Sequence, residues 1–358
     1  MSATPASAHA VEPAAPASII AAQPFLLFGM GARRKLLMRG DELLDARTGQ
    51  ALRRWPGAKA VIDPAGPTVV LTLPGDHGGT VTISEDAAGV WLQEGGERSA
   101  LSMAPVTLPT FLEGGRDPAR AALLRVLHHE ILLNIVDGQP LPNFMVYHKP
   151  WYRDGAMMAM VLAKTGNIGL IAEWIKDIRD PYDHNNAGRR EPDNLGQVLY
   201  LISLVSDAHH PVVATVLTEA ETWRKGDHIL GTSDFAEHPV YQTKWLKYGL
   251  RALSLPDPWI IPAVADSYSC LFWMDYRDQH VGNAGFSDVA YPYLMWAAGH
   301  FYGKLPAAPK LGFPLSWEAA ASQADYAGMT KVSAVYAQAR LAAPHTWHAA
   351  EMFLALSE

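Results

Sequence analysis

The chain has 358 residues, of which 49% are hydrophobic and 18% charged, with a formal net charge of −7 and a single cysteine. This length and apolar content predict a large core and leave room for two domains. The longest basic run is three residues, 33–35, so the sequence lacks the cationic track that a nucleic-acid partner requires. A lone cysteine, Cys270, excludes an intramolecular disulfide and a cysteine-rich zinc site, and no motif indicates a cofactor.

The first 23 residues are rich in alanine and proline, and we expect them to form a flexible tail. They lack the basic segment followed by an apolar segment that marks an intact signal peptide. They are also typical of the stretch after a cleavage site, so a periplasmic or secreted location and a cytoplasmic one both remain open. No stretch reaches about 18 uninterrupted apolar residues, so we expect no insertion into a membrane.

Residues 24–110 predict a small antiparallel β domain. Short β-branched runs at 69–73, 81–84 and 90–92 are separated by turns rich in glycine. This alternation of strand and turn signals is typical of a meander, forming either a small sandwich or a sheet packed on the next domain.

From about residue 116 the apolar residues follow a helical period, and the domain 116–358 is expected to be a succession of helix pairs. Pro118 begins the first helix. His128 and His129 in this helix lack metal-ligand spacing, and we expect one of them to face the core and the other to face solvent. The further predicted helices are 154–165, 167–179, 193–206, 208–224, 239–253, 263–277, 287–303, 316–326, 329–341 and 346–357. The fold class expected is mainly α, an (α/α)6-type toroid preceded by the β domain; a linear helical array is the alternative.

The strongest functional signal lies in residues 147–197. Trp151, Arg153 and Asp154 stand just before one predicted helix, and Glu191 and Asp193 just before another. Tryptophan offers a flat face to a sugar ring, and arginine with aspartate supplies donors and acceptors for hydroxyl groups. Two carboxylates can supply the acid and base of glycosyl transfer, so the pattern predicts a carbohydrate substrate.

Three short motifs in this order resemble those of (α/α)6-barrel glycoside hydrolases of the glucoamylase and glycogen-debranching type. They are Trp-Tyr-Arg-Asp at 151–154 followed by Thr-Gly-Asn at 165–167, Glu-Pro-Asp-Asn-Leu-Gly-Gln at 191–197, and Thr-Trp-His-Ala-Ala-Glu at 346–351. The resemblance implies exo-acting hydrolysis of an oligosaccharide or glycoside. It also implies that Asp193, with Glu191 as its competitor, is the general acid.

In the same resemblance, Arg153 and Asp154 bind sugar hydroxyls and Trp151 forms a platform. Asp154 and Asp193 also stand where a carboxylate caps a helix, so a purely structural role is the alternative for both. The remaining residues expected at the substrate are Asn194, Gln197, His184, Asn186, Tyr241, Trp347 and His348.

The general base is where this chain departs from the family pattern. The window 327–344, in which the family places a glutamate, contains no acidic residue, so Glu318 and Asp325 become the leading candidates. A displaced base, phosphate in place of the base, or β-elimination on a uronic acid would each explain the departure. The alternatives to a hydrolase are therefore a polysaccharide lyase and a non-catalytic glycan-binding protein. The polar loop 180–194 does not match a calcium-binding loop, and no metal is expected.

Overall fold

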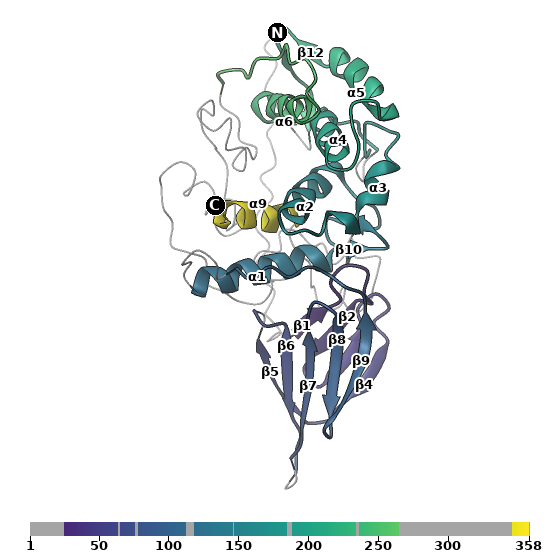
Figure 1. The fold of residues 1–358 in the computed structure, drawn as a ribbon, viewed down its shortest axis with the longest axis vertical. Helices are drawn as coiled ribbons and strands as arrows, with labels where there is room; N and C mark the ends of the chain where they lie inside the picture. The colour runs from purple at the N-terminus through teal and green to yellow at the C-terminus, as the bar shows by residue number, and fades with distance from the viewer. Residues whose placement is uncertain are drawn as a thin grey trace, which may run out of the picture.

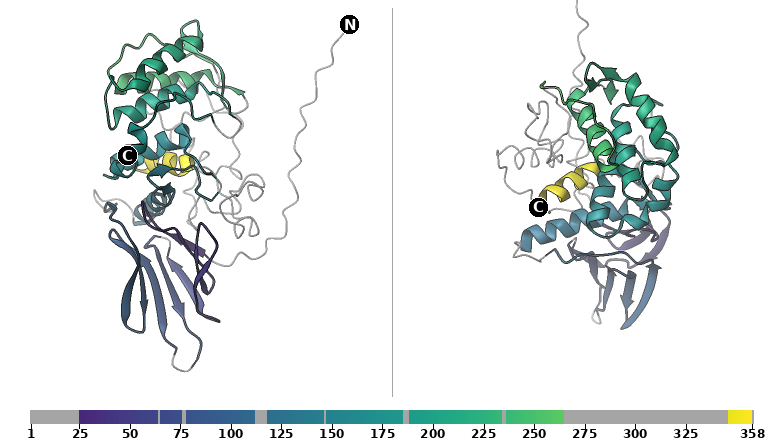
Figure 2. Two further views of the ribbon diagram at one scale, coloured as in Figure 1. Left: turned by 90° about the vertical axis from the view of Figure 1, so that its right-hand side faces the viewer. Right: turned by 45° about the horizontal axis from the view of Figure 1, so that its top comes forward.

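The computed structural model describes residues 25–63, 65–75, 78–111, 118–145, 147–184, 188–233, 236–264 and 346–357. Antiparallel sheets occupy residues 25–103, and helices make up most of the described residues from 118 onward. The sheets lie at one end of the molecule and the helices are stacked toward the other (Figures 1 and 2).

The sheet region consists of two antiparallel meanders in which each strand pairs with the next along the chain. The first, sheet A, contains β1 (Phe25–Phe28), β2 (Leu36–Arg39), β3 (Glu42–Asp45) and β4 (Ala51–Arg54). The second, sheet B, contains β5 (Lys59–Asp63), β6 (Thr68–Thr72), β7 (Thr80–Glu85), β8 (Gly89–Glu94) and β9 (Glu97–Met103).

The two sheets pack face to face because alternate side chains of each are apolar. Val81 and Ile83 of β7 are fully buried, and their neighbours in the strand are more exposed. They share a core with Leu26 and Phe28 of β1 from sheet A. This is the packing expected of a sandwich whose inward positions repeat every second residue.

Sheet A is buried on its other face as well. Phe25 and Leu27, which alternate with the inward residues of β1, belong to a second core that includes Leu133, Phe144 and Met145. Sheet A therefore has sheet B on one face and residues 133–145 on the other.

The helical region is built from α-helices, with short hairpins in the connections from α1 to α2 and from α5 to α6. Its helices are α1 (Pro118–Leu133), α2 (Tyr152–Lys164), the 3-10 turn η1 (Ile168–Leu170), α3 (Ala172–Lys176), α4 (Asp193–Ser203), α5 (Pro211–Thr222), α6 (Pro239–Ala252) and α9 (Thr346–Leu356). Two-stranded hairpins form from β10 (Ile135–Val136) with β11 (Gln139–Pro140), β12 (Arg224–Lys225) with β13 (His228–Ile229), and β14 (Thr232–Ser233) with β15 (Ala236–Glu237).

The helices pack in an order that differs from their order in the sequence. Helix α9 packs against both α1 and α2, so the C-terminal helix lies beside elements formed about 200 residues earlier (Figure 1). Helix α4 packs on α2 and α6, and Gly196 allows the closest approach, since a Cβ there would lie 2.1 Å from the carbonyl carbon of Trp245. The first turns of α2, α4 and α9 are thereby brought toward one region.

The expected fold class, a mainly α protein built as an (α/α)6 toroid, is wrong. The described residues are 34% helical and 25% strand, and they form several antiparallel sheets with too few helices for six helical hairpins. One reason is that segment 167–179, predicted as a helix, forms only η1 and the five-residue α3. Another is that hairpins β10–β15 occupy connections between helices. The predicted helices 287–303, 316–326 and 329–341, and all but the start of 263–277, lie outside the described residues.

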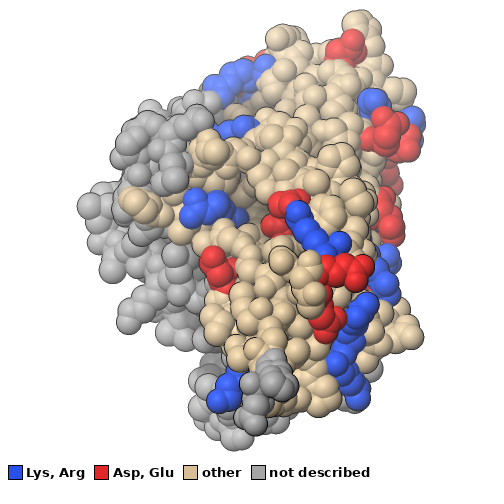
Figure 3. All heavy atoms as spheres, turned by 60° about the horizontal axis from the view of Figure 1, so that its bottom comes forward, with Lys and Arg blue, Asp and Glu red and all other residues tan. Residues whose placement is uncertain are grey.

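Within the described residues, no helix is both long enough and apolar enough to cross a membrane. On the face drawn in Figure 3, lysine and arginine side chains alternate with aspartate and glutamate side chains. That face therefore presents charges of both signs rather than a field of one sign.

Candidate functional site

Arg153, Glu191 and Asp193 form a buried charged cluster where helices α2 and α4 begin. The Arg153 guanidinium lies 3.0 Å from Asp193 Oδ2 through Nη2 and 3.2 Å from Glu191 Oε2 through the same nitrogen. Their side chains are 6%, 5% and 0% exposed for Arg153, Glu191 and Asp193 respectively. Pro192 lies between the two acidic residues, at the N-cap of α4, where its lack of an N–H leaves no donor to satisfy.

Asp193 accepts hydrogen bonds at both of its oxygens. Ser233 Oγ donates to Oδ1 at 2.6 Å, and Gln197 Nε2 donates to Oδ2 at 2.8 Å beside the bonds from Arg153. Gln242 of α6 in turn donates to Ser233 Oγ at 3.0 Å. The carboxylate is therefore held in place by α2, α4 and β14 together, with α6 supporting Ser233.

Other polar residues expected at the substrate extend this cluster. Asn194 donates to Gln197 Oε1 at 3.0 Å, and Gln197 donates to the Tyr241 hydroxyl at 3.4 Å. Asn194, Gln197 and Tyr241 are all at most 1% exposed. The amides thus link the charged cluster to the aromatic core between α4 and α6.

The loop before α4 is fastened to the start of α2. Asp183 Oδ2 accepts the backbone N–H of Tyr152, the first residue of α2, at 2.7 Å. The Asp183 N–H donates to Asn194 Oδ1 at 3.3 Å. His184 lies on the exposed part of this loop, 3.0 Å from Asp180.

Asp154 connects two of the sequence motifs. Its Oδ1 accepts the backbone N–H of Trp347 at 3.4 Å and the hydroxyl of Thr346 at 3.5 Å, so it lies at the N-terminus of α9. Asp154 is fully buried and Trp347 is 6% exposed. The carboxylate satisfies donors that the first turn of a helix leaves unpaired, which is a structural task.

Trp151 stands at the N-cap of α2 and is partly exposed. The Tyr147 ring meets it edge-on, with the ring centroids 4.9 Å apart. Trp151 lies two residues before Arg153 in the chain.

Residues 165–167 end α2 rather than lining the cluster. Gly166, at φ +75°, and Asn167 return hydrogen bonds to Ala163 and Leu162, the double bond of a Schellman motif. The Asn167 side chain exchanges two hydrogen bonds with the backbone of Thr107, at 2.9 Å each. This part of the motif joins α2 to the segment that follows β9.

His128 and His129 are both buried, 1% and 3% exposed, so the expectation that one faces solvent is wrong. His128 contacts Thr165 Oγ1 at 3.0 Å, and burial lowers its pKa to about 3. His129 contacts Glu85 Oε2 at 3.1 Å. The two histidines are covered from different sides, His128 by the end of α2 and His129 by Glu85 of β7.

Three of the expected site residues, Glu318, Asp325 and Asn186, lie outside the described residues, and the same holds for the side chain of His348. Ser233 and Gln242 belong to the cluster but were missed in the sequence, where no motif surrounds them. In the described part of the chain, no group of three histidine, cysteine, aspartate or glutamate side chains is arranged to hold a metal ion.

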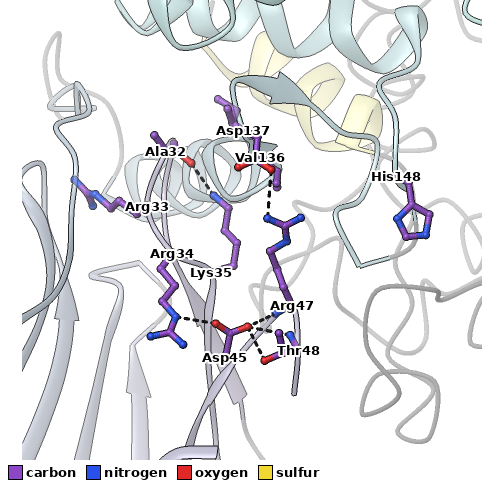
Figure 4. A pocket seen from close by; sticks show the side chains of 12 residues that line it. Ala32, Arg33, Arg34, Lys35, Asp45, Arg47, Thr48, Val136, Asp137 and His148 are labelled. Atoms are coloured by element: carbon purple, nitrogen blue, oxygen red, sulfur yellow. Dashed lines mark hydrogen bonds and ion pairs between the residues drawn. The ribbon is translucent and has the colours of Figure 1, made fainter. Parts of the chain in front are cut away.

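A cavity of about 550 Å³ lies elsewhere, where the turns of sheet A meet hairpin β10–β11 (Figure 4). None of the residues of the Arg153 cluster lines it. The cavity was not expected from the sequence, in which its lining residues are scattered between 31 and 148.

Comparisons with protein families, with curated proteins and with solved structures found no match to this chain. Function is therefore inferred from the geometry of the residues themselves and from the short motifs that contain them.

Proposed function

We propose that this chain is a glycoside hydrolase in which the Arg153 cluster binds the sugar and donates a proton to the bond that breaks. The observation that carries the proposal is the pair of carboxylates, Glu191 and Asp193, sharing one guanidinium in a buried site. Amide side chains that can bind hydroxyls adjoin it. Such a set offers the donors, acceptors and carboxylic acid that glycosidic cleavage uses.

Within this proposal, Glu191 is the proton donor. Asp193 has no exposed surface, and its two oxygens already accept bonds from Arg153, Gln197 and Ser233. A proton transfer from Asp193 would require those bonds to break. Glu191 keeps 5% of its side chain accessible, so a substrate can reach it with less rearrangement.

The second carboxylate of the reaction, which activates water or attacks the sugar, is not part of this cluster. An inverting enzyme would place it about 6.5–9.5 Å from Glu191, and a retaining enzyme about 5 Å away. Glu318 and Asp325 remain the candidates from the sequence.

The test compares Glu191→Gln with Asp193→Asn on glycosides that differ in leaving group. Loss of a general acid lowers turnover about 100-fold or more on substrates whose leaving group needs a proton. We expect Glu191→Gln to show this loss on alkyl glycosides and oligosaccharides, and a much smaller loss on dinitrophenyl glycosides. Asp193→Asn should impair both classes alike, because it releases Arg153.

Glu173→Gln is the matched control, since Glu173 is 84% exposed on α3 and its one ion pair among the described residues is with Lys176, at 2.8 Å. Melting curves establish that each variant is folded. A leaving-group dependence in Asp193→Asn instead of Glu191→Gln would reverse the two roles. Products that absorb as unsaturated uronates would identify a lyase, and glycan binding without any turnover would identify a binding protein.

A further inference from the structure

The cavity beside sheet A is lined by an excess of positive charge. Arg34 and Lys35 precede β2, Arg47 follows β3, and the acidic side chains are Asp45 and Asp137 (Figure 4). Arg33 also borders the cavity. Its guanidinium is occupied by Glu85 and by the carbonyl oxygens of three residues, namely Ala104, Asp86 and Ala87.

Lys35 carries a donor that no described residue uses. Its side chain is buried, and Nζ donates to the carbonyl oxygens of Gly29 and, at 2.8 Å, Gly31. An ammonium group has three N–H donors, so one of them is not used by a described residue, and Lys35 is among the residues that line the cavity. Gly29 and Gly31 adopt φ of +115° and +61°, which turns their carbonyl groups toward Lys35 and fixes the amine.

Arg34 and Arg47 also have side-chain N–H donors that no described residue uses. Arg34 Nε donates to Asp45 Oδ2 at 2.7 Å, and Arg47 Nη1 donates to Asp137 Oδ2 at 3.3 Å. These are the single side-chain bonds of each guanidinium within the described residues, although each guanidinium has five donors. Their side chains are 49% and 50% exposed, so the remaining donors are accessible from solvent.

Asp45 offsets part of this positive charge through Arg34, and its second oxygen is engaged in the turn after β3. Oδ1 accepts the backbone N–H groups of Arg47 and Thr48, at 3.0 and 2.9 Å, and the Thr48 hydroxyl at 3.0 Å. Asp45 therefore shapes the turn after β3 and places Arg47 over the cavity. This arrangement holds cationic groups in position before any ligand arrives.

We propose that this cavity is a binding site for a small ligand carrying an oxyanion, a carboxylate or a phosphate group. Lys35, Arg34 and Arg47 supply the donors. Arginine matches the planar geometry of a carboxylate or the edge of a phosphate, and the buried ammonium adds a fixed point charge. A cavity of about 550 Å³ has room for a ligand the size of an acidic or phosphorylated monosaccharide. The site does not depend on the glycoside hydrolase assignment.

The test measures binding to the full chain by titration calorimetry at pH 6, where Lys35 carries its charge. The probes are glucuronate, glucose 6-phosphate and inorganic phosphate, with glucose as the neutral probe, all at one ionic strength. We expect at least one anionic probe to bind, and the set that binds identifies the oxyanion as carboxylate, phosphate or both.

Arg47→Gln should weaken that binding about tenfold or more, as removal of a charged donor does. Arg53→Gln is the matched control, because Arg53 is 52% exposed and its single ion pair in the described part of the chain, to Glu94, is 3.4 Å long. Lys35→Met should weaken binding further. If Lys35→Met does not fold, the result with Arg47→Gln decides whether the cavity binds the anion. The proposal is overturned if no anionic probe binds, or if Arg47→Gln and Arg53→Gln bind the anion as the unaltered chain does.

Discussion

Replacing Lys35 by methionine should remove a pH dependence of stability that this one amine creates. Burial lowers the pKa of Lys35 from 10.5 to about 7, against the opposing attraction of Glu85. Arg33 and Arg47 also lower it, and Asp137 raises it. Between pH 7 and 10.5 the unfolded chain therefore binds the proton that the folded chain has lost, so the free energy of unfolding rises with pH in that window.

The size of the effect follows from the two pKa values. Integrating the proton difference from pH 7 to pH 9 gives about 2 kcal/mol of added stability from this group. Carboxylates and guanidinium groups do not ordinarily titrate in this interval, so Lys35 is the source among the charged groups around it. Methionine has a similar length and no charge, and the variant should lack the gain.

Urea unfolding of both proteins at pH 7 and pH 9 measures this difference. We expect the free energy of unfolding of the unaltered chain to rise by about 2 kcal/mol relative to Lys35→Met. Equal changes in both proteins would mean that Lys35 keeps an ordinary proton affinity in the folded state. The account of the cavity as a site with a desolvated amine would then be wrong.

Two further substitutions test how the helices are held together. Gly196→Ala should destabilise the protein by about 3 kcal/mol or prevent folding, since its Cβ would meet the Trp245 backbone at 2.1 Å. Gly169→Ala in η1 is the control, because a Cβ added there would have no neighbouring atom within 4 Å, and its urea midpoint should stay near that of the unaltered chain. Equal midpoints for Gly196→Ala and Gly169→Ala would contradict the close packing of α4 on α6. Asp154→Ala should cost about 1–3 kcal/mol, because the Trp347 N–H loses its acceptor, and Asp154→Asn should restore part of it. An unchanged melting temperature in Asp154→Ala would show that the carboxylate does not hold α9.

The elements with a strong local signal could be predicted from the sequence. The β-branched runs at 69–73 and 81–84 form β6 and β7, and the proline at 118 begins α1. The segment after Gly166 shows the limit of such signals. Its apolar spacing suits an α-helix and a 3-10 turn alike. The two hydrogen bonds of Asn167 to Thr107, a residue 60 positions away, have no local signal in the sequence.

The candidate site was predictable in its residue types but not in its geometry. The sequence places Glu191 and Asp193 two residues apart, yet it gives no sign of which one will be enclosed. The enclosure of Asp193 depends on Ser233, which lies 40 residues away in the chain and donates to its carboxylate, and on Gln242, which donates to the Ser233 hydroxyl. The cavity at Lys35 was missed for the same reason, since Asp137 reaches it from a distant hairpin.

The core shared by β1 and the end of α1 makes the two halves of the chain mutually dependent. A gene fragment that began near residue 116 would expose Leu133 and Phe144, which Phe25 and Leu27 cover in the intact protein. It would also leave the buried His129 without the Glu85 carboxylate. The sheets therefore cover apolar surface of the helical region, and truncation at the change of secondary structure should yield insoluble protein rather than a soluble helical fragment.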